Sequence, residues 1–324
     1  MKKPRFIDIP APADRNAYER AIERIIENNR KTEGLRTIYR LGNITTPGIS
    51  DIDILFVFEN GCRCTINGLE DLPRDERRLF THGIMAMPEK FLSQNNYYTI
   101  WSRHDVIWGK HYGAGQVRNS EEEKSLGVQT AMEFFLANYI DLEIQEAYGI
   151  FKLRALLQHM KGLLYDLELI GQEDAVIKAP LLELKEMIRI WFDEPDSIRK
   201  ISIWLQTFLP MFRDYLKGLF MKQALYFPSM EQYRIANNIT LINGNSLKSQ
   251  RQGWLLPAGL GVLGRKYFKI QHRMNRFIIT CPITHQSAPI TAQRFDFLRE
   301  MKAYNRTHLP NFMTMTTSIT AKII

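Results

Sequence analysis

The hydrophobic and polar positions of the first 110 residues predict a mixture of helices and strands. Apolar residues recur at helical spacing after Asp14, a residue type suited to a helix N-cap. The run Ile52–Phe58 is apolar almost throughout, which indicates a strand buried on both faces. The predicted elements are a helix over 14–29, strands Leu35–Leu41 and Ile52–Phe58, a short helix Leu72–Leu79 with Pro73 in its first turn, and a third strand Tyr97–Trp101.

The rest of the chain changes character twice. Helical spacing predicts helices over 121–147, 150–170, 179–192 and 197–226, with Pro210 breaking or kinking the last one. Their short connections favour antiparallel packing. Short apolar runs then predict a small sheet and a final helix: Ile239–Ile242, Trp254–Leu256, Tyr267–Ile270, Phe277–Ile279, and the helix Ala292–Tyr304.

These patterns predict three regions. We expect an α/β (α+β) domain at 1–118, an antiparallel helical bundle at 119–228 and a small, basic, β-rich C-terminal region at 229–324.

Composition excludes several classes of protein. Hydrophobic residues make up 45% and charged residues 24% of the 324 residues, which is typical of a globular chain and excludes a disordered one. The longest apolar runs are too short to cross a bilayer, and the first residues lack the apolar stretch of a signal peptide. Three cysteines cannot form a disulfide framework. We therefore expect a soluble, cytoplasmic protein without membrane insertion.

The net charge of +8 is unevenly distributed. Residues 231–324 hold 13 Lys and Arg against 3 Asp and Glu, whereas residues 1–230 hold 30 against 32. This asymmetry points to a polyanionic partner for the C-terminal region, with nucleic acid first and an anionic surface second. The alternative is a basic, solvated face that keeps the protein soluble.

The stretch Leu41–Phe58, LGNITTPGISDIDILFVF, carries candidate chemistry. Asp51 and Asp53 begin the apolar strand and alternate onto the same side, with Cα atoms roughly 6.6 Å apart at about 3.3 Å per residue. Two such carboxylates suit a pair of divalent cations, which would hold a triphosphate. Gly42 allows backbone to come close to phosphate, and the N–H groups of residues 43–46 would cradle it. The alternative is that the two acids cap a turn or face solvent, but same-side acids repel each other without a cation.

These residues resemble the nucleotidyltransferase superfamily of the DNA polymerase β type. Leu41-Gly42-Asn43 stands at the first part of its signature, and Asp51-Ile52-Asp53-Ile54 stands at the second part, seven residues on. The resemblance covers about residues 14–110. It implies a Mg²⁺-dependent (or Mn²⁺-dependent) enzyme that transfers a nucleoside monophosphate from an NTP such as ATP to a hydroxyl or phosphate and releases pyrophosphate. It also implies that Gly42, Asn43 and Ser50 frame the phosphates, and that a basic residue of the helical bundle, here Lys152, reaches the triphosphate.

Two departures from the family pattern matter. Asn43 stands where the family usually has Ser or Gly, although its amide can still donate to a phosphate oxygen. The third acid, expected on the next strand of the sheet, is absent from Tyr97–Trp101, and Asp105 just beyond it is the candidate. His82, His104 and His111 show no metal-ligand spacing and are interpreted as structural or exposed.

The basic C-terminal region supplies candidate acceptor-binding residues, which alternate with aromatic rings: Arg265, Lys266, Lys269, Arg273 and Arg276. Cations and rings in this pattern hold phosphates and stack bases, so RNA is the first expected acceptor. A strand with one charged face is the alternative. Two other functions stay open, namely a nucleotide-binding or regulatory protein that lost the third acid, and a nucleic-acid-binding module with an incidental acidic pair.

Overall fold

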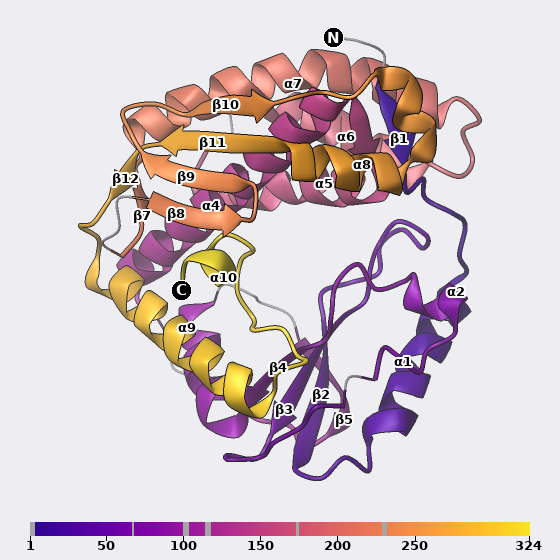
Figure 1. Ribbon diagram of the computed structural model, residues 1–324. Helices are drawn as coiled ribbons and strands as arrows, with labels where there is room; N and C mark the ends of the chain where they lie inside the picture. The colour runs from indigo at the N-terminus through magenta and orange to yellow at the C-terminus, as the bar shows by residue number, and fades with distance from the viewer. Residues whose placement is uncertain (1–3, 67, 100–103, 114–117, 173–174, 229–231) are drawn as a thin grey trace. The chain divides into compact units, whose positions relative to one another are not determined.

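The protein is described by a computed structural model that covers residues 4–66, 68–99, 104–113, 118–172, 175–228 and 232–324 (Figure 1). The chain divides into two compact units. The larger unit comprises Met1–Pro10, Gly127–Ala288 and Thr317–Ile323, and the smaller unit comprises Ala11–Leu126, Pro289–Thr316 and Ile324. Both units contain helices and strands, so the protein is a mixed α+β protein, as the sequence predicts.

The smaller unit is built on a four-stranded sheet with the order β4-β3-β2-β5 (Figure 1). Its strands are β2 (Leu35–Leu41), β3 (Asp53–Phe58), β4 (Met85–Pro88) and β5 (His104–Gly109). β2 is antiparallel to both β3 and β5, whereas β4 is parallel to β3. In this register Leu41 lies opposite Asp53, and Leu55 lies opposite Met85. The two strands predicted at 35–41 and 52–58 are confirmed.

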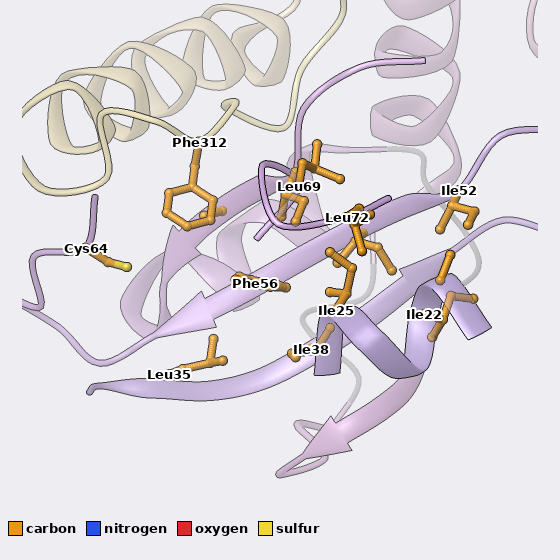
Figure 2. Close-up of a cluster of buried hydrophobic side chains, with 14 of the residues drawn as sticks. Ile22, Ile25, Leu35, Ile38, Ile52, Phe56, Cys64, Leu69, Leu72 and Phe312 are labelled. Atoms are coloured by element: carbon orange, nitrogen blue, oxygen red, sulfur yellow. The ribbon is translucent and has the colours of Figure 1, made fainter. Parts of the chain in front are cut away.

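Helices cover both faces of this sheet, because the side chains of β3 alternate between two hydrophobic cores. Ile54 and Phe56 belong to one core with residues of α1 (Arg15–Asn29), and Figure 2 shows Phe56 there with Ile25 of that helix and with Phe312. Leu55 and Val57 point to the other side, where they pack with residues of α9 (Pro289–His308). The near-continuous apolar run of β3 follows from this double burial.

The remaining helices of the smaller unit are short. They are α2 (Arg74–Arg77), the 3₁₀ helix η1 (Glu89–Phe91) and α3 (Leu92–Tyr98). Pro73 is the N-cap of α2, close to its predicted place in the first turn. Asp14 accepts a hydrogen bond from the Ala17 N–H and caps α1, as the sequence predicts.

The predicted strand Tyr97–Trp101 is wrong for its described residues. Tyr97 and Tyr98 end α3, Thr99 follows as its C-cap, and residues 100 and 101 lie outside the described part of the chain. The run predicts a strand because aromatic and β-branched residues favour strands. Here the burial of Leu92 and Asn95, three residues apart, places one face of a helix in the interior instead.

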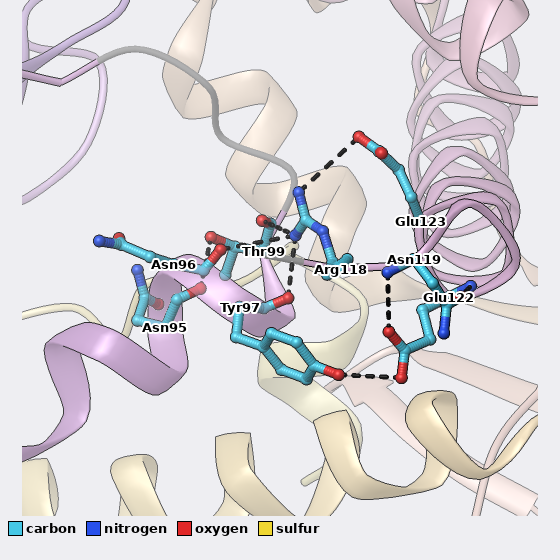
Figure 3. A network of polar contacts seen from close by, with 8 residues as sticks. All are labelled: Asn95, Asn96, Tyr97, Thr99, Arg118, Asn119, Glu122 and Glu123. Carbon is cyan, nitrogen blue, oxygen red and sulfur yellow. Dashed lines mark hydrogen bonds and ion pairs between the residues drawn. The ribbon is translucent and has the colours of Figure 1, made fainter. Parts of the chain in front are cut away.

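Arg118 ties the C-terminal end of α3 to the start of α4 (Figure 3). Its Nη1 atom donates to the carbonyl oxygens of Asn96, Tyr97 and Thr99 at 3.5, 2.9 and 2.7 Å. Such oxygens at a helix end have no partner within the helix. Next to Arg118, the Asn119 side chain accepts from the Glu122 N–H at 2.8 Å and caps α4. The Asn119 N–H in turn donates to the Glu122 carboxylate.

The larger unit holds most of the long helices and the second sheet. Its helices are α4 (Ser120–Tyr148, beginning in the smaller unit), α5 (Leu153–Leu169), α6 (Lys178–Arg189), α7 (Ser197–Lys222), η2 (Ala258–Leu263), α8 (Arg265–Met274) and α10 (Thr320–Ile323). The four predicted long helices correspond to α4, α5, α6 and α7. α7 does not end at Pro210 but continues through it, with Phe208 stacked on Phe212 across that position.

The strands of the larger unit form a four-stranded sheet in the order β10-β11-β9-β8 (Figure 1). They also form two small pairs, β1-β6 and β12-β7. They are β1 (Arg5–Ile7), β6 (Ile150–Lys152), β7 (Leu225–Tyr226), β8 (Gln232–Ala236), β9 (Ile239–Asn243), β10 (Lys248–Gly253), β11 (Asn275–Cys281) and β12 (Ile283–Thr284). The small sheet predicted after Pro228 is therefore present. Two of its predicted strands are wrong. Trp254–Leu256 follows the end of β10 and lies in no strand, and Tyr267–Ile270 lies in α8, whose buried positions Tyr267 and Gln271 are four residues apart.

The compact units do not coincide with the predicted boundaries at 118/119 and 228/229. The last helix, predicted over 292–304 and observed as α9, belongs to the smaller unit with the segment that follows it. Asn305 donates to the Ala86 carbonyl at 2.8 Å. The Met313 N–H donates to the carbonyl of Ile84, just before β4, and the Met313 carbonyl accepts from the N–H of Ala86 on β4. Within the described residues, no helix combines the length and apolar character that a bilayer crossing requires.

Candidate metal site

Asp51 and Asp53 stand at the head of β3. Asp53 is the first residue of the strand, and the Ile52 N–H between the two acids bonds to the Leu79 carbonyl at 3.1 Å. This bond fixes the start of β3 beside the segment that leads into β4. The structure brings a third group to the pair, because ligand atoms of Asp51, Asp53 and His82 all lie within 4.8 Å of one another.

His82 reaches the site because β4 runs parallel to β3. Residues that precede one parallel strand lie beside residues that precede the other, and His82 comes three residues before Met85 on β4. Its Nε2 atom lies 2.6 Å from Asp53 Oδ1, and its Nδ1 atom lies 2.7 Å from the Gly83 carbonyl oxygen.

The acids determine the protonation of His82. The hydrogen bond to Asp53 raises the pKa of the imidazole to about 9, with smaller contributions from the Gly83 carbonyl and the charges of Asp53 and Asp51, against the lowering effect of burial. At neutral pH and without a metal, His82 is therefore an imidazolium that donates from both nitrogens. The side chains of Asp53 and His82 are 26% and 31% exposed, so solvent reaches the site.

The second acid is held by a neighbour of His82. The Thr81 hydroxyl donates to Asp51 Oδ2. The segment 79–83 thus contacts the Asp51 carboxylate through a hydroxyl and the Asp53 carboxylate through an imidazole, and its Leu79 carbonyl accepts from the Ile52 N–H between them. This positions the acidic pair from one side.

The loop between β2 and β3 borders the acids. Gly42 has a φ of 64°, and a Cβ placed there would meet nothing within 4 Å, so the left-handed backbone is next to open space. Ser50 Oγ accepts from the N–H groups of Thr45 and Thr46 at 3.2 and 3.0 Å. Two of the four N–H groups predicted to cradle phosphate are therefore bonded to Ser50, whose side chain shapes the loop.

Tyr18 of α1 forms two hydrogen bonds with the same loop. Its hydroxyl accepts from the Gly48 N–H at 2.9 Å and donates to the Ser50 carbonyl at 2.7 Å. This side chain is fully buried, so the loop is fixed to the helix and through it to the sheet. No pattern along the sequence indicates this role of Tyr18.

The structure does not bring Asp105 to the acidic pair. Asp105 lies on β5 opposite Arg40, which donates to its carboxylate at 2.7 Å. Arg40 in turn lies opposite Ile54, one residue past Asp53 on β3. Side chains alternate along strands, so Asp105 shares a face with Ile54 rather than with Asp53. The position beside the two acids is taken by His82.

Asn43 is exposed in the loop after Gly42, and the other predicted site residues belong to the larger unit. Lys152 is the N-cap of α5, and its ammonium lies 4.6 Å from the centroid of the Phe268 ring. Arg265 forms an ion pair with Asp8. The remaining candidates are exposed, three on α8 and one on β11: Lys266, Lys269, Arg273 and Arg276.

His82 is the functional candidate that sequence reasoning missed. It has no partner at metal-ligand spacing in the sequence because its partners come from another strand. The signal that could have found it is positional: Thr81-His82-Gly83 directly precedes a short apolar run, and a run that pairs in parallel with β3 must begin beside Asp51 and Asp53.

Comparisons with known proteins leave the geometry as the basis for a function. No family model matches the sequence, and no curated protein and no solved structure matches the chain.

Proposed function

We propose that this chain is a metal-dependent nucleotidyltransferase that transfers a nucleoside monophosphate from an NTP to a hydroxyl or phosphate acceptor. The observation that carries the proposal is the convergence of Asp51, Asp53 and His82 at the head of β3, beside the open backbone at Gly42. The resemblance of residues 41–58 to the DNA polymerase β-type superfamily supports the same function.

The donor set fits a divalent cation. Carboxylate oxygens are the ligands preferred by Mg²⁺ and Mn²⁺, and an imidazole nitrogen suits the later first-row ions best. Asp51 and Asp53 would provide the carboxylates, and His82 would provide the nitrogen. A bound ion would hold the triphosphate and lower the pKa of the attacking hydroxyl.

The chain's own residues would orient the nucleotide. In this proposal Asn43 and the backbone N–H groups beside Gly42 donate to phosphate oxygens, while Ser50 and Tyr18 keep the loop in shape. The acceptor oxygen bonds to the α-phosphorus, the bond from that phosphorus to the bridging oxygen breaks, and pyrophosphate leaves. The acceptor's proton passes to water. Most of the rate enhancement comes from positioning and charge stabilisation.

RNA is the proposed acceptor. Lys266, Lys269 and Arg273 recur at helical spacing on α8 and are exposed, which supports contacts with a phosphate backbone. The aromatic rings near them are less available for bases, because Tyr267 is buried and Phe268 packs against Tyr148 with ring centroids 5.3 Å apart.

Release of pyrophosphate tests the function. The full chain is assayed with each of the four NTPs, with Mg²⁺ or Mn²⁺, and with RNA ends, protein hydroxyls and small alcohols as acceptors. We expect Asp51→Asn with Asp53→Asn to lower the rate by about 10³-fold or more, since charge-stabilising groups at active sites contribute on this scale. Asp71→Asn, which removes an exposed acid from the same unit, is the matched control and keeps the rate.

Thermal unfolding of the double variant separates lost chemistry from a lost fold. The proposal fails if the folded wild-type chain releases no pyrophosphate with any nucleotide and any acceptor of that panel.

A nucleotide-binding protein without transfer is the second candidate function. The observation that favours it is the ion pair of His82 with Asp53, since an imidazolium can neutralise the acids where a metal otherwise would. This candidate expects NTP binding that is unchanged by a chelator, together with no pyrophosphate release. Calorimetric titration of the chain with NTP, with and without a chelator, distinguishes the two.

A further inference from the structure

The third member of the acidic site is a nitrogen ligand. Asp51 and Asp53 offer carboxylate oxygens, whereas His82 offers an imidazole nitrogen at the same distance range, within 4.8 Å of both. Magnesium takes oxygen ligands and retains several waters. Manganese and the later first-row ions bind imidazole more favourably than magnesium does. The chemical identity of residue 82 therefore bears directly on the choice of metal.

The orientation of His82 suits metal binding. Its Nδ1 atom lies 2.7 Å from the Gly83 carbonyl oxygen, so Nδ1 carries a proton and donates it there. The opposite nitrogen, Nε2, faces Asp53 at 2.6 Å. Ligand histidines in metal sites commonly donate their second N–H to a carbonyl or carboxylate, which fixes the ring and leaves the other nitrogen for the ion.

The position of His82 is fixed by the fold and not by the acids alone. His82 comes after Leu79, whose carbonyl bonds to the Ile52 N–H at the start of β3. It comes before β4, which pairs in parallel with β3. Removing the acids would leave these backbone contacts in place. The backbone therefore places residue 82 beside the acids, and the Gly83 carbonyl oxygen, 2.7 Å from Nδ1, orients the ring from the side opposite Asp53.

We propose that His82 Nε2 is a metal ligand and that it makes this site select Mn²⁺ over Mg²⁺. Binding forms a bond from Nε2 to the ion and releases the proton that Nε2 shares with Asp53 to solvent. The inference rests on the metal-binding part of the proposed function and not on nucleotide transfer. The competing role for His82 is a counter-ion to Asp53 that never contacts a metal.

Metal titration of the full chain without nucleotide tests the inference. Affinities for MnCl₂ and MgCl₂ are measured by calorimetry for wild type, His82→Asp, His82→Gln and the control His111→Gln, an exposed histidine of the same unit. We expect His82→Gln to weaken Mn²⁺ binding by at least about tenfold, since even indirect changes at metal sites cost about 10- to 100-fold. His82→Asp, which restores three carboxylates, lowers the Mn²⁺-to-Mg²⁺ affinity ratio by about tenfold or more.

A spectroscopic readout reports the nitrogen itself. Pulsed electron paramagnetic resonance of the Mn²⁺-loaded chain is expected to show coupling to a ¹⁴N nucleus in wild type and His111→Gln, and none in His82→Asp. An equal affinity ratio in wild type and His82→Asp, or no ¹⁴N coupling in wild type, overturns the inference. Thermal unfolding confirms that each variant is folded.

The outcome is separable from that of the proposed function. If Mn²⁺ binds through His82 and no pyrophosphate is released, the metal inference holds and the transferase proposal fails. If pyrophosphate is released equally well in wild type and His82→Gln with either metal, the transferase proposal holds and the metal inference fails.

Discussion

The two units carry opposite charges at their candidate sites. In the smaller unit, two carboxylates converge with one imidazole at the head of β3. In the larger unit, residues 232–288 contain eight Lys and Arg and neither Asp nor Glu. An acidic cluster binds small cations, and a stretch without acids repels them and attracts polyanions. Because each proposed binding site lies in its own unit, a change in one candidate site should leave binding at the other intact.

The largest effect that sharpens this comparison concerns α8. Replacing Lys266, Lys269 and Arg273 by Gln removes three exposed cations. We expect single-stranded RNA affinity to fall on the order of 10- to 100-fold at about 0.15 M salt, and the slope of log affinity against log salt to decrease by about 2. Fluorescence anisotropy over a salt series measures both.

The matched control removes three exposed cations elsewhere in the larger unit, at Lys185, Arg199 and Lys222. Equal losses in the two triple variants would mean that net charge, and not α8, attracts RNA. Neither variant should change Mn²⁺ binding. Deleting residues 231–324 is not a usable test, because it removes α9 from the sheet of the smaller unit.

A smaller effect is expected from Arg118, which stabilises the smaller unit without touching the acids. Arg118→Met leaves the carbonyl oxygens of Asn96, Tyr97 and Thr99 without their shared donor. The free energy of unfolding should fall by about 2–3 kcal/mol, the scale of hydrogen bonds made by charged groups. Denaturant unfolding measures it.

The ion pair of Arg118 with Glu123, at 3.9 Å and with Glu123 65% exposed, contributes little. Glu123→Gln should therefore change the free energy of unfolding by less than about 0.5 kcal/mol. A loss as large as that of Arg118→Met would assign the stabilisation to the ion pair and not to the carbonyl contacts.

The smallest effect concerns a buried acid of the larger unit. Burial raises the pKa of Asp166 well above its ordinary value. The folded state therefore holds the proton to higher pH than the unfolded state, and stability declines as pH rises from the unfolded pKa, about 3.9, toward the folded pKa. Asp166→Asn should match wild type near the lower limit of this window and exceed its stability at neutral pH. Chemical unfolding over a pH series measures the difference, with the exposed Asp193→Asn as a control that shows no such trend.

Sequence reasoning found what depends on local pattern. The helix capped by Asp14, the strands at 35–41 and 52–58 and the long helices follow from spacing along the chain. Strand alternation is also local, and it predicts that the side chains of Asp51 and Asp53 point to the same side. What sequence reasoning missed depends on contacts between distant segments.

Three particular misses share that cause. His82 joins the acids only through the parallel pairing of β3 with β4, and Tyr18 holds the Gly48–Ser50 turn from α1. α8 replaces a predicted strand because Tyr267 and Gln271 are buried together, which aromatic content alone does not reveal. The run Tyr97–Trp101, where the family pattern predicts a third acid, ends a helix in its described residues, and the group that lies beside Asp51 and Asp53 is the imidazole of His82.

The division of the smaller unit into Ala11–Leu126 and Pro289–Thr316 has a consequence for synthesis on the ribosome. The face of the sheet that carries Leu55 and Val57 emerges long before α9, its cover. At about 5–20 residues per second, the intervening residues 127–288 take roughly 10–30 s to be made. During that interval the nascent chain exposes the apolar face of this sheet. We therefore expect chaperones at the ribosome exit to bind the nascent chain.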